Sequence, residues 1–224
     1  MTFPPSSDGD PRHLGSIHLV RSARTAFSAE DRLTGRLDPP LDDEGLVQAE
    51  AVAHATADAG VTHVFTSPLL RARQTADVIA LRIGVAPRIV DDLADLDVGV
   101  WAGLTMREAS AASPDEFAWF FRMPQVAEIP GGERTWDAQA RVIGALEEIA
   151  RGAGSGSVVA VTHELPIRFV LMRLRELEGT AIWDPTIPPG WTTRLRASEE
   201  GLQIPTVLED MFRAARRRHE SPSR

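Results

Sequence analysis

Several short stretches of this sequence place charged and nucleophilic side chains directly after apolar segments. The run SIHLV leads into Arg21 and Ser22, and the run SVVAVT leads into His163 and Glu164. Arg71 follows a third such segment, VTHVFTS. Guanidinium groups bind oxyanions through two parallel donors, and histidine, serine and carboxyl groups transfer protons or attack electrophiles. Together these residue types predict a site for an anionic small molecule.

The elements that must position these side chains alternate between strands and helices. Short apolar or β-branched runs predict four strands, at 16–21, 61–67, 86–90 and 157–163. Helical spacing of apolar residues predicts helices over 41–60, 68–84, 133–152 and 165–177. Gly60 and Gly84 are typical helix stops. This order predicts an α/β fold with a mainly parallel central sheet flanked by helices, in which ligands bind beyond the carboxyl ends of the strands.

The 224 residues fit one domain of ordinary size. We expect a flexible N-terminal tail at 1–14, the folded domain at 15–205 and a basic C-terminal tail at 206–224. Within the domain, a helical insertion at about 104–132 is expected to cover the ligand end of the sheet. The segments TTRLRAS and GLQIP predict a closing hairpin.

Composition excludes several functional classes. The apolar fraction of 43% suffices for a packed core, and no apolar run reaches the length of a membrane span. Without cysteine there is no disulfide, thiolate nucleophile or cysteine-ligated metal. A net charge of −8 argues against nucleic acid as a partner. The start, MTFPPSSDGDPRH, lacks the basic and apolar blocks of a secretory signal, so we expect a cytoplasmic protein.

Five segments in order resemble the histidine phosphatase superfamily, the phosphoglycerate-mutase-like proteins. The resemblance covers roughly residues 16–204 and rests on GRLDPPLDDEGLVQA, SPLLRARQTA, LADLDVGVWAG, IPGGE and VVAVTHELPIR. It implies a phosphate-binding cluster made of Arg21, Arg24, Arg71 and His163. It also implies that Asp95 stands at the position of the acid that protonates the leaving oxygen, one methylene shorter than the family's glutamate.

The same resemblance places departures at the site itself. The family motif after the first strand is Arg-His-Gly, and here it reads Arg21-Ser22-Ala23, so a serine stands where the phosphate-accepting histidine is expected. A free hydroxyl is a poor nucleophile unless a base or metal activates it. Glu164 replaces a glycine directly after His163 and brings a carboxylate to a pocket for an anion.

Three interpretations of these departures remain open. The first is a degenerate phosphatase that binds phosphate esters and hydrolyses them slowly or not at all. The second is a repurposed isomerase, lyase or hydrolase of a biosynthetic or catabolic pathway, with acid–base chemistry by Ser22, Asp95, His163 and Glu164. The third is a non-catalytic regulatory module.

The remaining expectations concern ligands and partners. Four acidic residues cluster between the third strand and the insertion and could suggest a Mg²⁺ site: Asp91, Asp92, Asp95 and Asp97. For Asp91, Asp92 and Asp97 we favour a solvated acidic loop. We predict no metal and no cofactor. Apolar side chains of the insertion predict an apolar or aromatic substrate body: Phe117, Trp119, Phe120 and Met123. A homodimer is possible, and no nucleic acid or membrane partner is expected.

Overall fold

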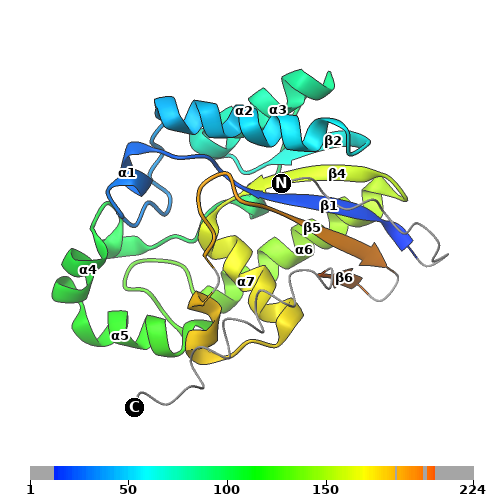
Figure 1. The fold of residues 1–224 in the computed structure, drawn as a ribbon. Helices are drawn as coiled ribbons and strands as arrows, with labels where there is room; N and C mark the ends of the chain where they lie inside the picture. The colour runs from blue at the N-terminus through cyan, green and yellow to red at the C-terminus, as the bar shows by residue number, and fades with distance from the viewer. Residues whose placement is uncertain (1–12, 185, 199–200, 205–224) are drawn as a thin grey trace, which may run out of the picture.

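The computed structural model describes residues 13–184, 186–198 and 201–204. Its central sheet has six strands in the order β3-β2-β4-β1-β5-β6 (Figure 1). The strands are β1 (His13–Arg21), β2 (Val61–Thr66), β3 (Arg88–Ile89), β4 (Ser157–Thr162), β5 (Thr192–Ser198) and β6 (Gly201–Gln203). The four strands from β3 to β1 are parallel neighbours, whereas β5 is antiparallel to both β1 and β6. The predicted α/β fold with a mainly parallel sheet is confirmed.

Helices cover both faces of the sheet. In Figure 1, α2 (Asp43–Ala57) and α3 (Leu70–Ile83) lie on one face, and α6 (Thr135–Ala153) and α7 (Glu164–Arg175) lie on the other. The shorter helical elements are α1 (Ala26–Ala29), α4 (Met106–Ala112), α5 (Pro114–Arg122), η1 (Asp91–Leu93), η2 (Gly99–Trp101), η3 (Pro124–Val126) and η4 (Gly179–Trp183). The sheet is therefore the middle layer of three.

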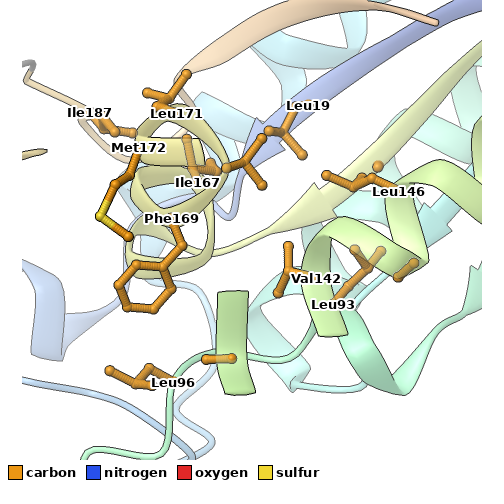
Figure 2. Close-up of a cluster of buried hydrophobic side chains, with 14 of the residues drawn as sticks. Leu19, Leu93, Leu96, Val142, Leu146, Ile167, Phe169, Leu171, Met172 and Ile187 are labelled. Atoms are coloured by element: carbon orange, nitrogen blue, oxygen red, sulfur yellow. The ribbon is translucent and has the colours of Figure 1, made fainter. Parts of the chain in front are cut away.

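The strand β4 shows how the core divides between the two faces. Side chains alternate along a strand, so Val158 and Ala160 enter the cluster on the α6 and α7 side, while Val159 and Val161 enter the cluster on the α2 and α3 side. Figure 2 shows the first cluster, in which labelled side chains of α6 and α7 meet Leu19 of β1. Burial on both faces explains why the central strands read as continuous apolar runs.

The element boundaries differ from the predicted ones at a few places. The first strand begins at His13, inside the expected N-terminal tail, because β1 pairs with β5 as well as β4. The helix α2 ends at Ala57, and Gly60 instead occupies the turn before β2 with a φ of 64°. Gly84 does end α3, in the left-handed conformation. The expected basic tail at 206–224 lies outside the described residues.

The stretch expected as an insertion contains two helices beside the carboxyl ends of the strands. Thr105 and Glu108 form a capping box at the start of α4, and Pro114 occupies the first turn of α5. Side chains of both helices line the cavity described below. The hairpin predicted from TTRLRAS and GLQIP is confirmed as β5 and β6.

Candidate functional site

A cavity of about 750 Å³ opens at the carboxyl edge of the parallel strands. Arg21 is the last residue of β1, and Ser22 follows it. His163 and Glu164 follow β4 directly, and Arg71 lies in the first turn of the helix that follows β2. All five residues line the cavity, together with Asp95 from the loop after η1. Parallel strand ends therefore bring together residues that are far apart in the sequence.

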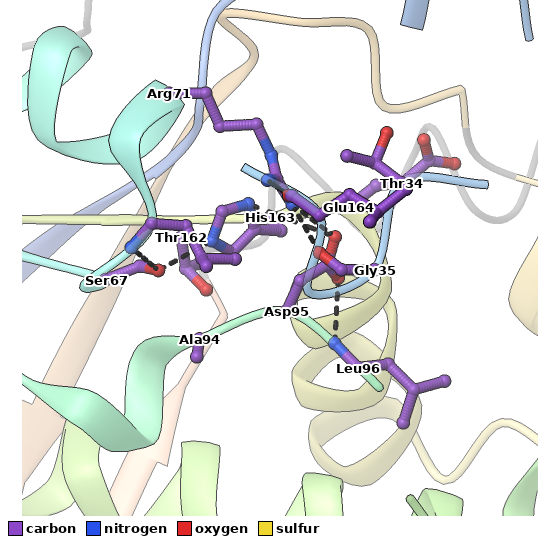
Figure 3. A network of polar contacts seen from close by, with 12 residues as sticks. Thr34, Gly35, Ser67, Arg71, Ala94, Asp95, Leu96, Thr162, His163 and Glu164 are labelled. Atoms are coloured by element: carbon purple, nitrogen blue, oxygen red, sulfur yellow. Dashed lines mark hydrogen bonds and ion pairs between the residues drawn. The ribbon is translucent and has the colours of Figure 1, made fainter. Parts of the chain in front are cut away.

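Arg71 and Asp95 form a buried ion pair at the floor of this cavity (Figure 3). Arg71 Nη2 lies 2.9 Å from Asp95 Oδ2, and the same guanidinium donates to the backbone oxygens of Leu37 and Gly35 at 2.9 and 3.0 Å. Burial raises the pKa of Asp95, against the opposing effects of Arg71 and the Leu96 N–H. The pair fixes the position of Arg71, and burial makes Asp95 easier to protonate than an exposed carboxyl group.

His163 lies beside this pair and is 2% exposed. Its Nε2 is 2.7 Å from the Ser67 hydroxyl, while its Nδ1 is buried without a hydrogen-bond partner among the described residues. Burial lowers the pKa of His163, and the positive charges of Arg71 and Arg21 lower it further. The imidazole is therefore neutral near pH 7, and the 4.0 Å separation between Nδ1 and Asp95 Oδ2 is not an ion pair there.

A second charged network, centred on Glu164, lines the same cavity. Glu164 Oε2 lies 2.6 Å from Arg21 Nη1, and Glu164 Oε1 lies 2.8 Å from Arg168 Nη2 and 3.0 Å from Arg168 Nε. Loop carbonyls hold both arginines from behind, because Arg21 donates to the Ile187 oxygen and Arg168 to the Ile182 oxygen. One carboxylate thus bridges two mostly buried guanidinium groups.

Ser22 lines the cavity and is 5% exposed. Its backbone is held on both sides, since its N–H donates to the Thr162 oxygen at 2.8 Å and its oxygen accepts from the Gly190 N–H. No described residue hydrogen-bonds to its hydroxyl, and no described contact joins it to His163. The hydroxyl therefore faces the cavity without a base beside it.

Arg24 is the one expected site residue that the structure does not bring into the cluster. Its guanidinium is bound by Asp42 at 2.9 Å and by Glu44 at 2.5 Å, at the start of α2. The carboxylate of Asp42 also caps α2 by accepting from the Gly45 N–H. The arginine therefore joins the β1 loop to α2 rather than lining the cavity.

One side of the cavity is aromatic. Phe120, Phe121 and Trp183 line it, and the Phe121 and Trp183 rings lie 4.7 Å apart. Of the apolar residues expected to meet a substrate, Phe120 faces the cavity, whereas Phe117 packs against Trp101 and Trp119 is half-exposed outside the lining. Trp183 also donates from Nε1 to the Phe121 oxygen and covers the Arg168 guanidinium.

The strand order and the arginine-lined cavity agree with the result of a comparison with known protein families, which covers most of the chain. The profile of the histidine phosphatase superfamily (branch 1) matches residues 17–210. The chain belongs to the histidine phosphatase superfamily. Within this superfamily it is 30% identical over 165 residues to phosphoserine phosphatase 1 of Hydrogenobacter thermophilus, covering 74% of this chain and 78% of that protein.

Other superfamily members show the same likeness. The metal-independent phosphoserine phosphatase of Arabidopsis thaliana is 33% identical over 164 residues, which cover 71% of this chain and 68% of that protein. Among solved structures, YhfR of Bacillus stearothermophilus superposes with a TM-score of 0.79 at 22% identity, over 85% of this chain and 95% of that one. The latter likeness shows the fold alone.

Sequence reasoning missed two residues of the cavity lining, Arg168 and Trp183. A signal existed for Arg168, because it stands four residues after Glu164, the spacing at which a carboxylate and an arginine pair on a helix. No comparable signal marked Trp183, which reaches the site through tertiary packing, whereas the place of Ser67 after the second strand had marked it as a position near the site. Within the described ranges, no three His, Cys, Asp or Glu side chains are grouped to hold a metal, and no helix is long and apolar enough to cross a membrane.

Proposed function

We propose that this superfamily member binds a phosphate ester, or a similar anionic small molecule, in the cavity at the strand ends. Arg21 at the end of β1 and Arg71 in the first turn of α3 both line that cavity, and this convergence supports the proposal. Guanidinium groups orient an oxyanion through paired donors. The relatives named phosphoserine phosphatases make phosphoserine the first ester to assay.

The proposal includes weak or absent phosphatase activity through a phosphohistidine. The position that the family motif gives to the phosphate-accepting histidine is Ser22, and the single observation that carries this part is its hydroxyl without a described base. Asp95 is the proton donor in this scheme, since burial keeps its carboxyl protonated to higher pH. The aromatic wall of Phe120, Phe121 and Trp183 receives the apolar or aromatic body of the ester.

Two measurements on the unmodified protein test this function. Calorimetric titration with phosphoserine, phenyl phosphate and inorganic phosphate should show binding at the cavity. Phosphate release from the two esters should be slow, and denatured protein should carry no acid-labile phosphoryl group. Rapid release with a phosphorylated His163 would contradict the proposal, because the second histidine would then be the nucleophile.

A repurposed acid–base enzyme is the second candidate. It is favoured by the 4.0 Å separation between His163 Nδ1 and Asp95 Oδ2 in one cavity, because burial raises the pKa of Asp95 and lowers the pKa of His163. Ser22 and Glu164 also line this cavity. A proton donor and a proton acceptor are thereby available without a nucleophile. Location in the cytoplasm, a homodimer and a purely regulatory role stay predictions.

A further inference from the structure

Any ligand held by Arg21 lies beside the carboxylate of Glu164. That carboxylate is fixed by three arginine contacts of 2.6 to 3.0 Å, and its side chain is 35% exposed at the cavity wall. Glu164 is the first residue of α7, directly after His163, so its backbone is fixed beside the site. Its carboxylate can turn away only by breaking its ion pairs with Arg21 and Arg168. A negative charge is thus built into the wall that receives the anion.

The charged groups that line the cavity leave little net positive charge. Three guanidinium groups, those of Arg21, Arg71 and Arg168, face the carboxyl groups of Asp95 and Glu164, and His163 is neutral. One net positive charge remains, because Asp95 is ion-paired with Arg71 and Glu164 with Arg21 and Arg168. The rim adds none, since Arg32 and Arg107 are balanced there by Glu30 and Asp31.

Arg21 keeps one edge of its guanidinium for a ligand. Nη1 is occupied by Glu164 and by the Ile187 oxygen, while no described residue accepts a hydrogen bond from Nε or Nη2. These two adjacent donors match two oxygens of one oxyanion. They give no compensation for a second negative charge, which would meet Glu164 in a partly buried setting where charges interact strongly.

We infer that the cavity selects esters whose acidic group carries one negative charge, phosphodiesters or sulfate esters, over phosphate monoester dianions, and that Glu164 sets this preference. The inference rests on the proposed anion-binding function and narrows its substrate class. The cavity has room for the two arms of a diester, one against the aromatic wall and one against the hydroxyl-bearing side of Thr25, Ser28 and Thr34.

Three ligands that share a phenyl group test the inference by calorimetric titration. Phenyl phosphate is a dianion at about pH 8, because its second pKa is near 6. Phenyl sulfate has nearly the same shape with one charge less, and methyl phenyl phosphate keeps the phosphorus with one charge. The proteins are the unmodified chain, Glu164→Gln and the control Glu128→Gln. Glu128 is an exposed acid paired with Arg134 outside the cavity lining.

We expect at least one monoanion to bind the unmodified chain and the control about tenfold tighter than phenyl phosphate, or ~1.4 kcal/mol. Glu164→Gln keeps a side-chain oxygen for Arg168 and should reduce the preference to below about threefold. Preference for phenyl sulfate alone identifies a sulfate ester, and preference for methyl phenyl phosphate alone identifies a phosphodiester.

The inference is overturned if phenyl phosphate binds the unmodified chain as tightly as both monoanions. It is also overturned if Glu164→Gln keeps the full preference, because another group would then set it. Absence of binding by all three ligands removes the proposed anion-binding function as well, so the two failures can be told apart.

Discussion

Glu164 Oε2 lies 2.6 Å from Arg21 Nη1, and the register of two parallel strands brings these residues together. Arg21 is the register partner of Thr162, so the residues that follow β4 emerge beside the end of β1. The ion pair is therefore a consequence of the central sheet and not of a flexible loop. An acid at position 164 therefore opposes the binding of an anion by Arg21.

Glu164→Gly should strengthen the binding of inorganic phosphate. The substitution removes a carboxylate from the anion site and leaves Arg21 and Arg168 with fewer internal partners. Because Glu164 is about one third exposed, we expect the low end of the Coulombic range, about 1 kcal/mol or roughly fivefold in affinity. Calorimetry on both proteins measures it, and equal affinities would show that phosphate binds away from Glu164.

Ser22→His combined with Ala23→Gly should raise phosphatase activity if the chain is a decayed phosphatase. The imidazole would restore a nucleophile beside Arg21, and glycine would remove a buried methyl group from the backbone next to it. Release of nitrophenol from p-nitrophenyl phosphate should increase by about a hundredfold, the lower end of the range for a positioned catalytic group. An unchanged rate in a folded double variant would argue against the interpretation of the chain as a decayed phosphatase.

Ser22→Ala distinguishes a phosphatase that has lost its activity from an enzyme that uses Ser22 in a new reaction. In a decayed phosphatase the Ser22 hydroxyl has no role, so the variant should keep the affinity for phosphate esters and the slow turnover of the unmodified protein. In a recruited enzyme the variant should lose turnover of its own substrate while its thermal stability stays unchanged. Parallel measurements of melting temperature, ester affinity and turnover distinguish the two cases.

Arg71→Met should destabilise the fold by about 3 kcal/mol, because it leaves the buried carboxyl of Asp95 without its partner. Two loop carbonyls, those of Gly35 and Leu37, lose their donor as well. The matched control is Arg134→Met, which breaks an exposed pair with Glu128 and should cost less than about 1 kcal/mol. Urea unfolding measures both, and similar losses would contradict a structural role for the Arg71–Asp95 pair.

The buried His18 should make stability fall in mild acid. Burial, with a smaller effect of Arg194, lowers the pKa of His18 from 6.5 to about 4. The folded chain thus binds a proton at His18 more weakly than the unfolded chain does. The contribution of the neutral imidazole to the unfolding free energy is therefore complete above about pH 6.5 and is lost as pH falls towards 4. The loss reaches about 3 kcal/mol.

His18→Gln removes this titration, and urea unfolding at several pH values measures it. The difference in unfolding free energy between the two proteins should be constant above about pH 7 and should shrink as pH falls through the window of His18. A constant difference across the whole range would mean that His18 does not titrate differently on folding.

The sequence predicted the fold and most of the site for identifiable reasons. Continuous apolar runs marked the central strands because both faces of the sheet are covered, and the residues directly after β1 and β4 line the cavity. Arg24 shows the limit of this logic, because it follows the same strand and yet pairs with Asp42 and Glu44. Adjacency to a strand end does not determine where a long side chain points.

The bridge that Glu164 forms between Arg21 and Arg168 could not be predicted from the sequence, for a different reason. It depends on the backbone oxygens of Ile182 and Ile187, which orient the two guanidinium groups from a loop between α7 and β5. Backbone carbonyls carry no residue-specific signal. The same holds for Trp183, whose place over Arg168 follows from the packing of η4 against α5.

The pairing of β1 with β4 determines when during synthesis the central sheet can form. Ser16 and Ser157 are 141 positions apart and yet neighbours in the sheet, so the first strand gains its parallel partner only after most of the chain has been made. Contacts of such long range require a large loss of chain entropy before they stabilise the fold, which slows folding. During synthesis, the apolar segment that ends at Arg21 therefore remains unpaired until β4 has been made. A chaperone that shields extended apolar segments should bind the nascent chain in this interval and release it once the region of residue 157 has emerged.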